Sequence, residues 1–365
     1  MLRDLTIENY RLFRRFTLDS IARVNLIVGV NNCGKSSLLE AIYLLTGKGN
    51  PSRLLDILSE RGEFVSRSLE PRYEKRISGG YQIAHIFHGH HLDIGHAVRI
   101  QSQSERPVSL TISFGEIRQP SLFEKLEEDL GSESRSWILV IRYTQDGIEP
   151  VKESLGVLED GLLAYPPRPH RRKLTTPEQR VRLVTTSYLG YDELAGLWDN
   201  ITLTPKEDKV VEALQILEPH VERISFTSRQ TSNSGILLKL KDELEPIPLG
   251  STGDGMRRVL ALTASLVSVE GGTLLVDEID TGLHYETLTD MWRLVLETSG
   301  KRNAQVFATT HSWDCVRSFQ EALSEVSDDD LGCLIRLEQR DDHIQPVSYS
   351  RDELAVAKQQ DIEVR

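Results

Sequence analysis

A phosphate-binding pattern lies near the start of the chain, in the segment "GVNNCGKSSLLEAIYLLTG" of residues 29–47. Glycines let such a loop curl so that successive backbone N–H groups point at phosphate oxygens at the start of a helix. Lys35 supplies a mobile positive charge for the β and γ phosphates, and the hydroxyl of Ser36 is a ligand for Mg²⁺. We therefore expect a nucleotide with Mg²⁺, bound by loop residues that include Asn31, Asn32, Cys33 and Gly34.

A pair of carboxylates follows a second apolar run, "TLLVDEID". Buried strands rarely end in two adjacent carboxylates, because unpaired charge is costly in an apolar environment. We expect Asp277 to hold the water shell of Mg²⁺ and Glu278 to polarise the attacking water. The alternative is an ordinary acidic pair at the end of a strand.

A histidine closes a third apolar run, "QVFATTHS". Neighbouring parallel strands deliver their carboxyl ends to the same crevice, so His311 is expected near Asp277. There an imidazole contacts the γ phosphate or orients the water. The alternative is a histidine with a structural role only.

A glycine turn, "GSTGDG" at residues 250–255, precedes an apolar helix. Ser251, Gly253 and Gly255 build a helix N-terminus that is free to receive an anion. Since the chain already has one phosphate loop, a second anion site suits the nucleotide of a neighbouring subunit. The alternative is a tight turn with an N-cap.

The elements around these motifs follow from apolar spacing. Strands are expected at 2–10, 15–21 and 24–29, followed by a helix over 35–45. Residues 48–183 predict an inserted, mainly antiparallel β lobe with strands at 107–114, 136–143 and 156–166. Two segments of this lobe, residues 153–158 and the segment near Leu54, fit either a strand or a helix. Residues 188–220 predict helices, and 223–228, 235–240, 273–280 and 305–312 predict strands. We expect one domain over 1–365, with segments 1–47 (N-terminal strands and phosphate loop), 48–183 (β lobe), 184–249 (helical lobe) and 250–365 (glycine turn, carboxylate pair, histidine and tail).

Composition narrows the class of protein. The 365 residues are 39% hydrophobic and 27% charged, and no apolar run approaches the roughly 18 residues that span a bilayer. Three scattered cysteines and the lack of an apolar signal-peptide core favour the cytoplasm, without a disulfide framework. A net charge of −12 excludes DNA binding by the whole surface. The basic segment 166–182 is either a local DNA contact or a solvated Pro-rich loop.

The order of these motifs resembles ATP-binding-cassette-type (ABC) ATPase heads, specifically the SMC/RecF-like branch. "IENYRLFRRFTLD" is similar to the strand with Asn-aromatic-Arg that leads to the phosphate loop there. "STGDGMRR", "LLVDEIDTGLHY" and "TTHS" most resemble the ATPase part of the overcoming-lysogenization-defect (OLD) family. The resemblance covers residues 1–47 and 245–318, and the β lobe only in outline.

The resemblance implies an α/β P-loop NTPase with a parallel core sheet, an antiparallel β lobe and a helical lobe. It implies a head-to-tail homodimer with two ATP molecules between the subunits, and a role in phage defence or DNA repair with DNA or a separate effector protein. The resemblance assigns ATP binding to the loop residues Asn32, Gly34, Lys35, Ser36 and Ser37. It assigns the metal to Asp277 and the attacking water to Glu278. It assigns the element that acts across the dimer to Ser251 and Gly253, and the switch histidine to His311. An ATP-driven protein-interaction switch without nucleic-acid contact is the alternative.

Some features depart from the family or belong to no motif. The glycine turn is not the Leu-Ser-Gly-Gly-Gln of transporters, which counts against a transport ATPase. For the glutamine that links the lobes, Gln82 and Gln101 are weak candidates. The residues after His311 are too few for the nuclease (Toprim) domain of OLD proteins, so nuclease activity is not expected. The histidines of "HIFHGHHLDIGH" have spacing that could hold zinc, but a solvated or phosphate-facing loop is favoured.

Overall fold

The computed structural model describes residues 1–67, 78–104, 106–116, 137–158, 161–165, 181–186, 189–227, 235–328, 330–340 and 343–359. The predicted basic segment therefore lies outside the described residues, apart from its last two positions. No described helix is both long enough and apolar enough to span a membrane.

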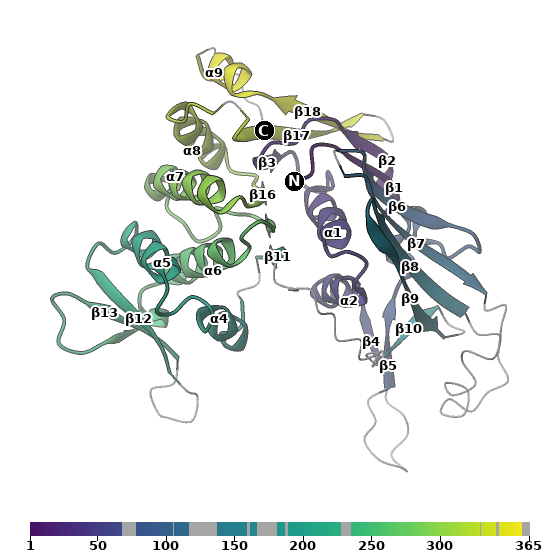
Figure 1. Ribbon diagram of the computed structural model, residues 1–365, viewed down its shortest axis with the longest axis horizontal. Helices are drawn as coiled ribbons and strands as arrows, with labels where there is room; N and C mark the ends of the chain where they lie inside the picture. The colour runs from purple at the N-terminus through teal and green to yellow at the C-terminus, as the bar shows by residue number, and fades with distance from the viewer. Residues whose placement is uncertain are drawn as a thin grey trace, which may run out of the picture.

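A six-stranded sheet forms the centre of the molecule (Figure 1). Its order is β11 (Val181–Val184), β15 (Thr273–Val276), β16 (Gln305–Thr309), β3 (Val24–Val28), β17 (Gly332–Arg340) and β18 (His343–Tyr349). The first five strands run parallel, and β18 pairs antiparallel with β17. Strands β3, β15 and β16 are buried along their whole length, which is why their sequences are mostly apolar.

A second, nine-stranded antiparallel sheet lies beside it. Its order is β2 (Phe13–Leu18), β1 (Leu5–Tyr10), β6 (Ala97–Ser102), β7 (Val108–Glu116), β8 (Trp137–Gln145), β9 (Ile148–Val157), β10 (Leu162–Tyr165), β5 (Ser78–Gln82) and β4 (Phe64–Arg67). The first two predicted N-terminal strands thus share one sheet with strands of the predicted β lobe. Residues 153–158 lie mostly in β9, and the segment near Leu54 is helix α2 (Pro51–Glu60).

Helix α1 (Lys35–Thr46) lies between the two sheets (Figure 1). It contacts β1, β6 and β7 on one side and β11, β15 and β16 on the other. Such a helix must be apolar around most of its circumference, and nine of its residues are buried. The phosphate loop at its start is therefore fixed to both sheets.

Helices cover the opposite face of the parallel sheet. They are α6 (Asp254–Ser268), α7 (Tyr285–Arg302), α8 (Trp313–Ser324) and α9 (Arg351–Gln359). The inner faces of α7 and α8 form one apolar core with β3, β15 and β16 that includes Trp292 and Phe319. Helices α7, α8 and α9 were not predicted from the sequence.

A smaller lobe packs on the other side of α6. It contains α4 (Tyr191–Trp198), α5 (Pro205–Gln215) and a three-stranded sheet of β12 (Val221–Thr227), β13 (Gly235–Leu240) and β14 (Ile247–Pro248). Val210, Leu214 and Trp198 share a core with Val259 and Leu260 of α6. The helical prediction for residues 188–220 and the two strands after it are confirmed.

Candidate active site

The phosphate loop joins β3 to α1 through two glycines with positive φ. Gly29 has φ +143° and Gly34 has φ +96°, a region that favours glycine. A Cβ on Gly29 would lie 2.7 Å from both the Sγ of Cys33 and the carbonyl oxygen of Leu337. Gly34 is the N-cap of α1 and supplies no side-chain hydrogen bond. No side chain caps the first turn of α1, so its N–H groups can donate to an anion.

Lys35 folds back over its own loop. Its Nζ donates to the carbonyl oxygens of Gly29 over 2.7 Å and Val30 over 3.0 Å. These bonds hold the ammonium group beside the loop. The flexible side chain of Lys35 can move the ammonium from this position toward a phosphate. Asn31 and Asn32 are exposed on the loop, and Ser37 is buried within α1.

The thiol of Cys33 lies at a helix N-terminus but does not have a lowered pKa. A thiol at a helix N-terminus is expected to have a lowered pKa. Here the side chain is 1% exposed and packs under the loop, and this burial raises the pKa of the Cys33 thiol despite the nearby positive charge of Lys35. The cysteine in the loop is therefore a small apolar side chain that supports the turn at Gly29.

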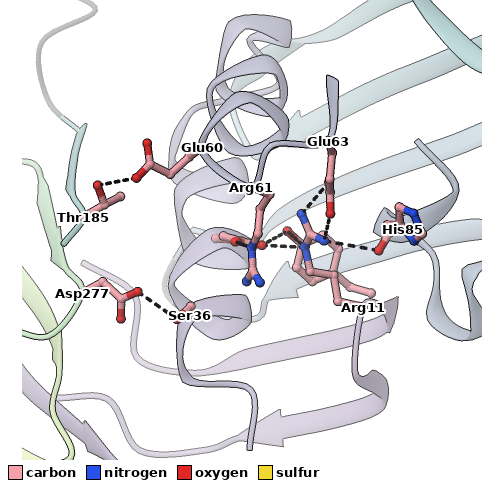
Figure 2. Close-up of polar contacts among 10 residues, drawn as sticks. Arg11, Ser36, Glu60, Arg61, Glu63, His85, Thr185 and Asp277 are labelled. Carbon is pink, nitrogen blue, oxygen red and sulfur yellow. Dashed lines mark hydrogen bonds and ion pairs between the residues drawn. The ribbon is translucent and has the colours of Figure 1, made fainter. Parts of the chain in front are cut away.

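Ser36 and Asp277 meet at the carboxyl end of the parallel sheet. The Oγ of Ser36 donates to Oδ2 of Asp277 over 2.8 Å (Figure 2). The Oγ1 of Thr309 donates to the other carboxylate oxygen, Oδ1, over 2.5 Å. A hydroxyl and a carboxylate oxygen in contact are hard ligands of the kind that Mg²⁺ prefers, so these residues fit that ion.

Glu278 stands next to this pair in an unusual conformation. Its φ is 47°, in the left-handed region that costs a non-glycine residue roughly 1–3 kcal/mol. Its N–H donates to Oγ1 of Thr309 over 2.8 Å, and Thr281 donates to its Oε2 over 3.3 Å. Nδ1 of His311 lies 3.7 Å from Oε1 of Glu278, and both side chains are partly exposed. The structure thus brings the predicted carboxylate pair and histidine together.

The glycine turn lies at the start of α6. Gly253 is the N-cap, has φ +94° and provides no side-chain cap, and Ser251 is exposed. A Cβ on Gly255 would lie 2.8 Å from the carbonyl oxygen of Gly282. The contact of this turn is therefore with the loop that follows Glu278.

A buried charge network anchors α1 at its outer side (Figure 2). Arg11, 7% exposed, pairs through Nε with Glu40 of α1 over 2.6 Å and through a terminal nitrogen with Glu63 over 2.9 Å. Arg61 pairs with the other oxygen of Glu40 over 2.6 Å. Removing one partner of such a network leaves a buried charge, so Arg11 fixes the phosphate-loop helix to the turn between β1 and β2. From the sequence, Arg11 was noted only as part of the segment "IENYRLFRRFTLD" that resembles the SMC/RecF-like branch, and its pairing with Glu40 was not predicted.

Neither of the two glutamine candidates lies in the parallel sheet. Gln82 ends β5 and Gln101 lies in β6, both in the antiparallel sheet. The residue that follows parallel strand β11 is Thr185, whose hydroxyl donates to Glu60 at the end of α2 over 2.8 Å (Figure 2). Spacing alone did not predict that β11 joins this sheet.

The imidazoles of the histidine segment contact one another and the backbone. Among the described residues, which include all of 85–96, no group of three or more His, Cys, Asp or Glu side chains is placed to hold a metal ion. His85 and His90 contact each other through their Nδ1 atoms over 3.2 Å, and His88 contacts the carbonyl oxygen of Arg11.

Asp328 and Asp330 belong to the acidic run 327–330, which the sequence favours as a solvated turn, and both are exposed. Asp328 and Asp330 precede β17, which pairs with β3 in the parallel sheet. Asp328 and Asp330 lie at the amino end of the parallel sheet, whereas the phosphate loop lies at its carboxyl end. The second acidic pair, 341–342, lies outside the described residues.

Comparisons with known proteins agree with this geometry. A family model described as "AAA ATPase domain" matches residues 1–153, and one described as "AAA domain, putative AbiEii toxin, Type IV TA system" matches residues 210–314. An "ATP/GTP phosphatase" of Helicobacter pylori is 23% identical over 97% of each chain. A "DNA replication and repair protein RecF" of Staphylococcus epidermidis is 48% identical over 44 residues, 12% of each chain.

The fold is also that of a solved structure. An SMC head bound to the C-winged helix domain of ScpA matches with a TM-score of 0.50 and 14% identity, covering 96% of this chain and 99% of that one. The chain thus has the fold of a P-loop NTPase of the SMC-head type. Together, the family models and the Helicobacter relative support ATPase activity at a general level.

Proposed function

We propose that the protein is an OLD/SMC-like ATPase that hydrolyses ATP and forms a head-to-tail dimer when ATP is bound. The proposal rests chiefly on one observation, the 2.8 Å contact of Ser36 with Asp277 beside Glu278 and His311. These residues come from three strand ends that the sequence keeps far apart. Their convergence on a glycine loop suits phosphoryl transfer to water.

Each group has a definite task in this proposal. Loop amides and Lys35 bind the β and γ phosphates, while Ser36 and Asp277 hold Mg²⁺, which neutralises phosphate charge when bound. Glu278 orients the attacking water and accepts its proton as the oxygen bonds to the γ phosphorus and ADP leaves. His311, 3.7 Å from Glu278, holds that carboxylate and reaches toward the γ phosphate.

The dimer is supported by the glycine turn at Ser251, Gly253 and Gly255. Like α1, helix α6 begins at a glycine N-cap with positive φ and no side-chain cap, and in this proposal the start of α1 already binds a nucleotide. In the proposed dimer this turn binds the γ phosphate held by the other subunit. ATP thereby joins two subunits and its hydrolysis separates them.

We further propose that the dimer acts on DNA or with a separate effector protein, in phage defence or DNA repair. The short match to RecF supports the DNA part, and the resemblance to OLD proteins supports the defence part. A second function, a protein-interaction switch that never touches nucleic acid, is favoured by the net charge of −12.

The ATPase rate with and without DNA tests both functions. Wild-type protein is expected to hydrolyse ATP with Mg²⁺, and Lys35→Ala to lose both binding and hydrolysis. Stimulation by DNA that weakens steeply with salt supports the DNA function, because phosphate contacts release counterions. An ATPase rate that DNA leaves unchanged favours the switch, and a wild type without activity contradicts the proposal.

Pure protein is also expected not to cut DNA. A metal-dependent nuclease needs its own converging carboxylates, and the described residues hold no such cluster outside the ATP site. Incubation of plasmid with the protein, ATP and Mg²⁺ or Mn²⁺ tests this. Cleavage that persists through purification and is lost in an Asp328→Asn, Asp330→Asn double variant would contradict it.

A further inference from the structure

The backbone of Glu278 needs support from its neighbours. Its φ of 47° is unfavourable for a side chain with a Cβ, and such a conformation persists only where the surroundings hold it. The N–H group is held by Thr309. The carbonyl oxygen accepts from the N–H of Thr281 over 3.1 Å and from Arg258 over 2.8 Å.

Arg258 holds three carbonyl groups at once. It lies on α6 and is 3% exposed. One terminal nitrogen donates to the carbonyl of Thr185 over 2.6 Å, and the other donates to the carbonyls of Asp277 over 2.6 Å and Glu278 over 2.8 Å. The planar fork of a guanidinium reaches both strand ends together, which a single ammonium nitrogen cannot do.

The same helix begins at the glycine turn. Arg258 lies one helical turn after Asp254, the first residue of α6. Gly255, in that first turn, packs so closely on Gly282 that a Cβ would lie 2.8 Å from its carbonyl oxygen. A shift of the turn therefore moves the loop after Glu278 and, through Arg258, the backbone of Glu278 itself.

We propose that Arg258 is a positioning residue that ties the geometry of Glu278 to the glycine turn. The inference rests on the proposed function and adds a coupling to it. When the turn binds the nucleotide of the other subunit, α6 fixes the carboxylate that acts on the subunit's own nucleotide. Hydrolysis in one site is thereby linked to occupancy of the other.

The test is steady-state ATPase kinetics of Arg258→Lys, with ATP-induced dimerisation followed by light scattering. We expect kcat to fall at least about tenfold while KM for ATP stays within about twofold, because the residue acts on the water-activating group and not on ATP binding. The ATP-bound dimer should persist longer than in wild type. The plot of rate against ATP concentration should lose any sigmoidal shape that wild type shows.

Controls separate this role from a structural one. Arg293→Lys on α7, an exposed arginine paired with Asp290 and Glu325, makes the same change away from the site and should match wild type. Thermal melts check that each variant is folded. If Arg258→Lys is unfolded, Arg258→Gln replaces it, because glutamine keeps amide N–H donors. The same loss of kcat is expected for Arg258→Gln.

Two results would overturn the inference. One is an Arg258 variant with kcat within about twofold of wild type, and the other is a variant whose ATP affinity falls in step with kcat. A wild type that neither hydrolyses ATP nor dimerises contradicts the proposed function and this inference together. An active, dimerising wild type with an unaltered Arg258→Lys variant contradicts this inference alone.

Discussion

The hydroxyl of Ser36 donates a hydrogen bond to Oδ2 of Asp277 over 2.8 Å, although 241 positions separate the two residues. The contact is possible because β3 and β15 run parallel on either side of β16, so their carboxyl ends open at the same edge. It places the first residues of α1 beside the carboxylate pair. Every proposed role in hydrolysis depends on this relationship.

Thr309 is expected to matter for hydrolysis through its hydroxyl. That oxygen donates to Asp277 and accepts the N–H of Glu278. Thr309→Val keeps the volume but leaves a buried N–H without its acceptor, which costs about 1–3 kcal/mol of stability, and kcat should fall about tenfold or more. ATPase kinetics and urea unfolding measure both effects.

Thr309→Ser is the matched control, since it keeps the hydroxyl and loses one methyl group. We expect its kcat to lie near that of wild type. A valine variant as active as the serine variant would show that the hydroxyl does not position the carboxylates.

The motifs and their strand ends could be predicted from sequence, because each is a continuous apolar run followed by polar residues. The supporting residues could not. Arg258 follows a second arginine on a helix, and nothing in that spacing shows that its side chain turns inward to three carbonyl groups. Interpreted from sequence alone, Arg257 and Arg258 fit either phosphate contacts or the outer face of the helix.

The wider architecture was predictable only in part for a similar reason. Strand β11 comes after the β lobe, yet it pairs with β15 in the parallel sheet. Strand β17 follows an acidic run that resembles a solvated turn, yet it pairs with β3. Pairing between distant segments depends on packing of the whole chain, which local periodicity does not contain.

Alkylation of Cys33 is expected to be slow in the folded protein. The thiol is buried and its pKa is raised by that burial, so little thiolate is present and access is limited. Iodoacetamide at pH 7.5 should modify it at least about tenfold more slowly than in denatured protein, and ATP with Mg²⁺ should slow it further. Peptide mass spectrometry follows the reaction. Equal labelling with and without nucleotide would refute shielding by ATP.

Stability is expected to fall at alkaline pH because buried groups resist ionisation. Burial raises the pKa of Cys333 from 9.0 to about 11 and that of Tyr143 from 10.0 to about 12. Below pH 9 Cys333 is neutral in both the folded and the unfolded state, so its contribution to the free energy of unfolding is fully present. Above pH 9 the unfolded thiol ionises and the folded thiol does not, which lowers the free energy of unfolding by up to about 1.4 kcal/mol per pH unit.

Urea unfolding at pH 8, 9 and 10.5 measures this loss. Cys333→Ala removes one titrating group, so its stability should fall less steeply between pH 9 and 10.5 than that of wild type. Identical slopes for the two proteins would show that Cys333 ionises equally in the folded and unfolded states.

Lys35→Ala provides the reference for the central test. Removing the ammonium should abolish nucleotide binding, so this variant should neither hydrolyse ATP nor change its mass when ATP is added. It defines the signal of a monomer that carries no nucleotide.

The most direct test is light scattering of Glu278→Gln with saturating ATP and Mg²⁺. Glutamine keeps the size of the side chain but cannot accept the proton of the attacking water, so hydrolysis should slow by about a hundredfold or more while Lys35, Ser36 and Asp277 still bind ATP. This variant should accumulate as a dimer, at about twice the mass of Lys35→Ala under the same conditions. A Glu278→Gln protein that binds ATP and stays monomeric would contradict the ATP-dependent dimer, and one that hydrolyses ATP at the wild-type rate would contradict the role of Glu278.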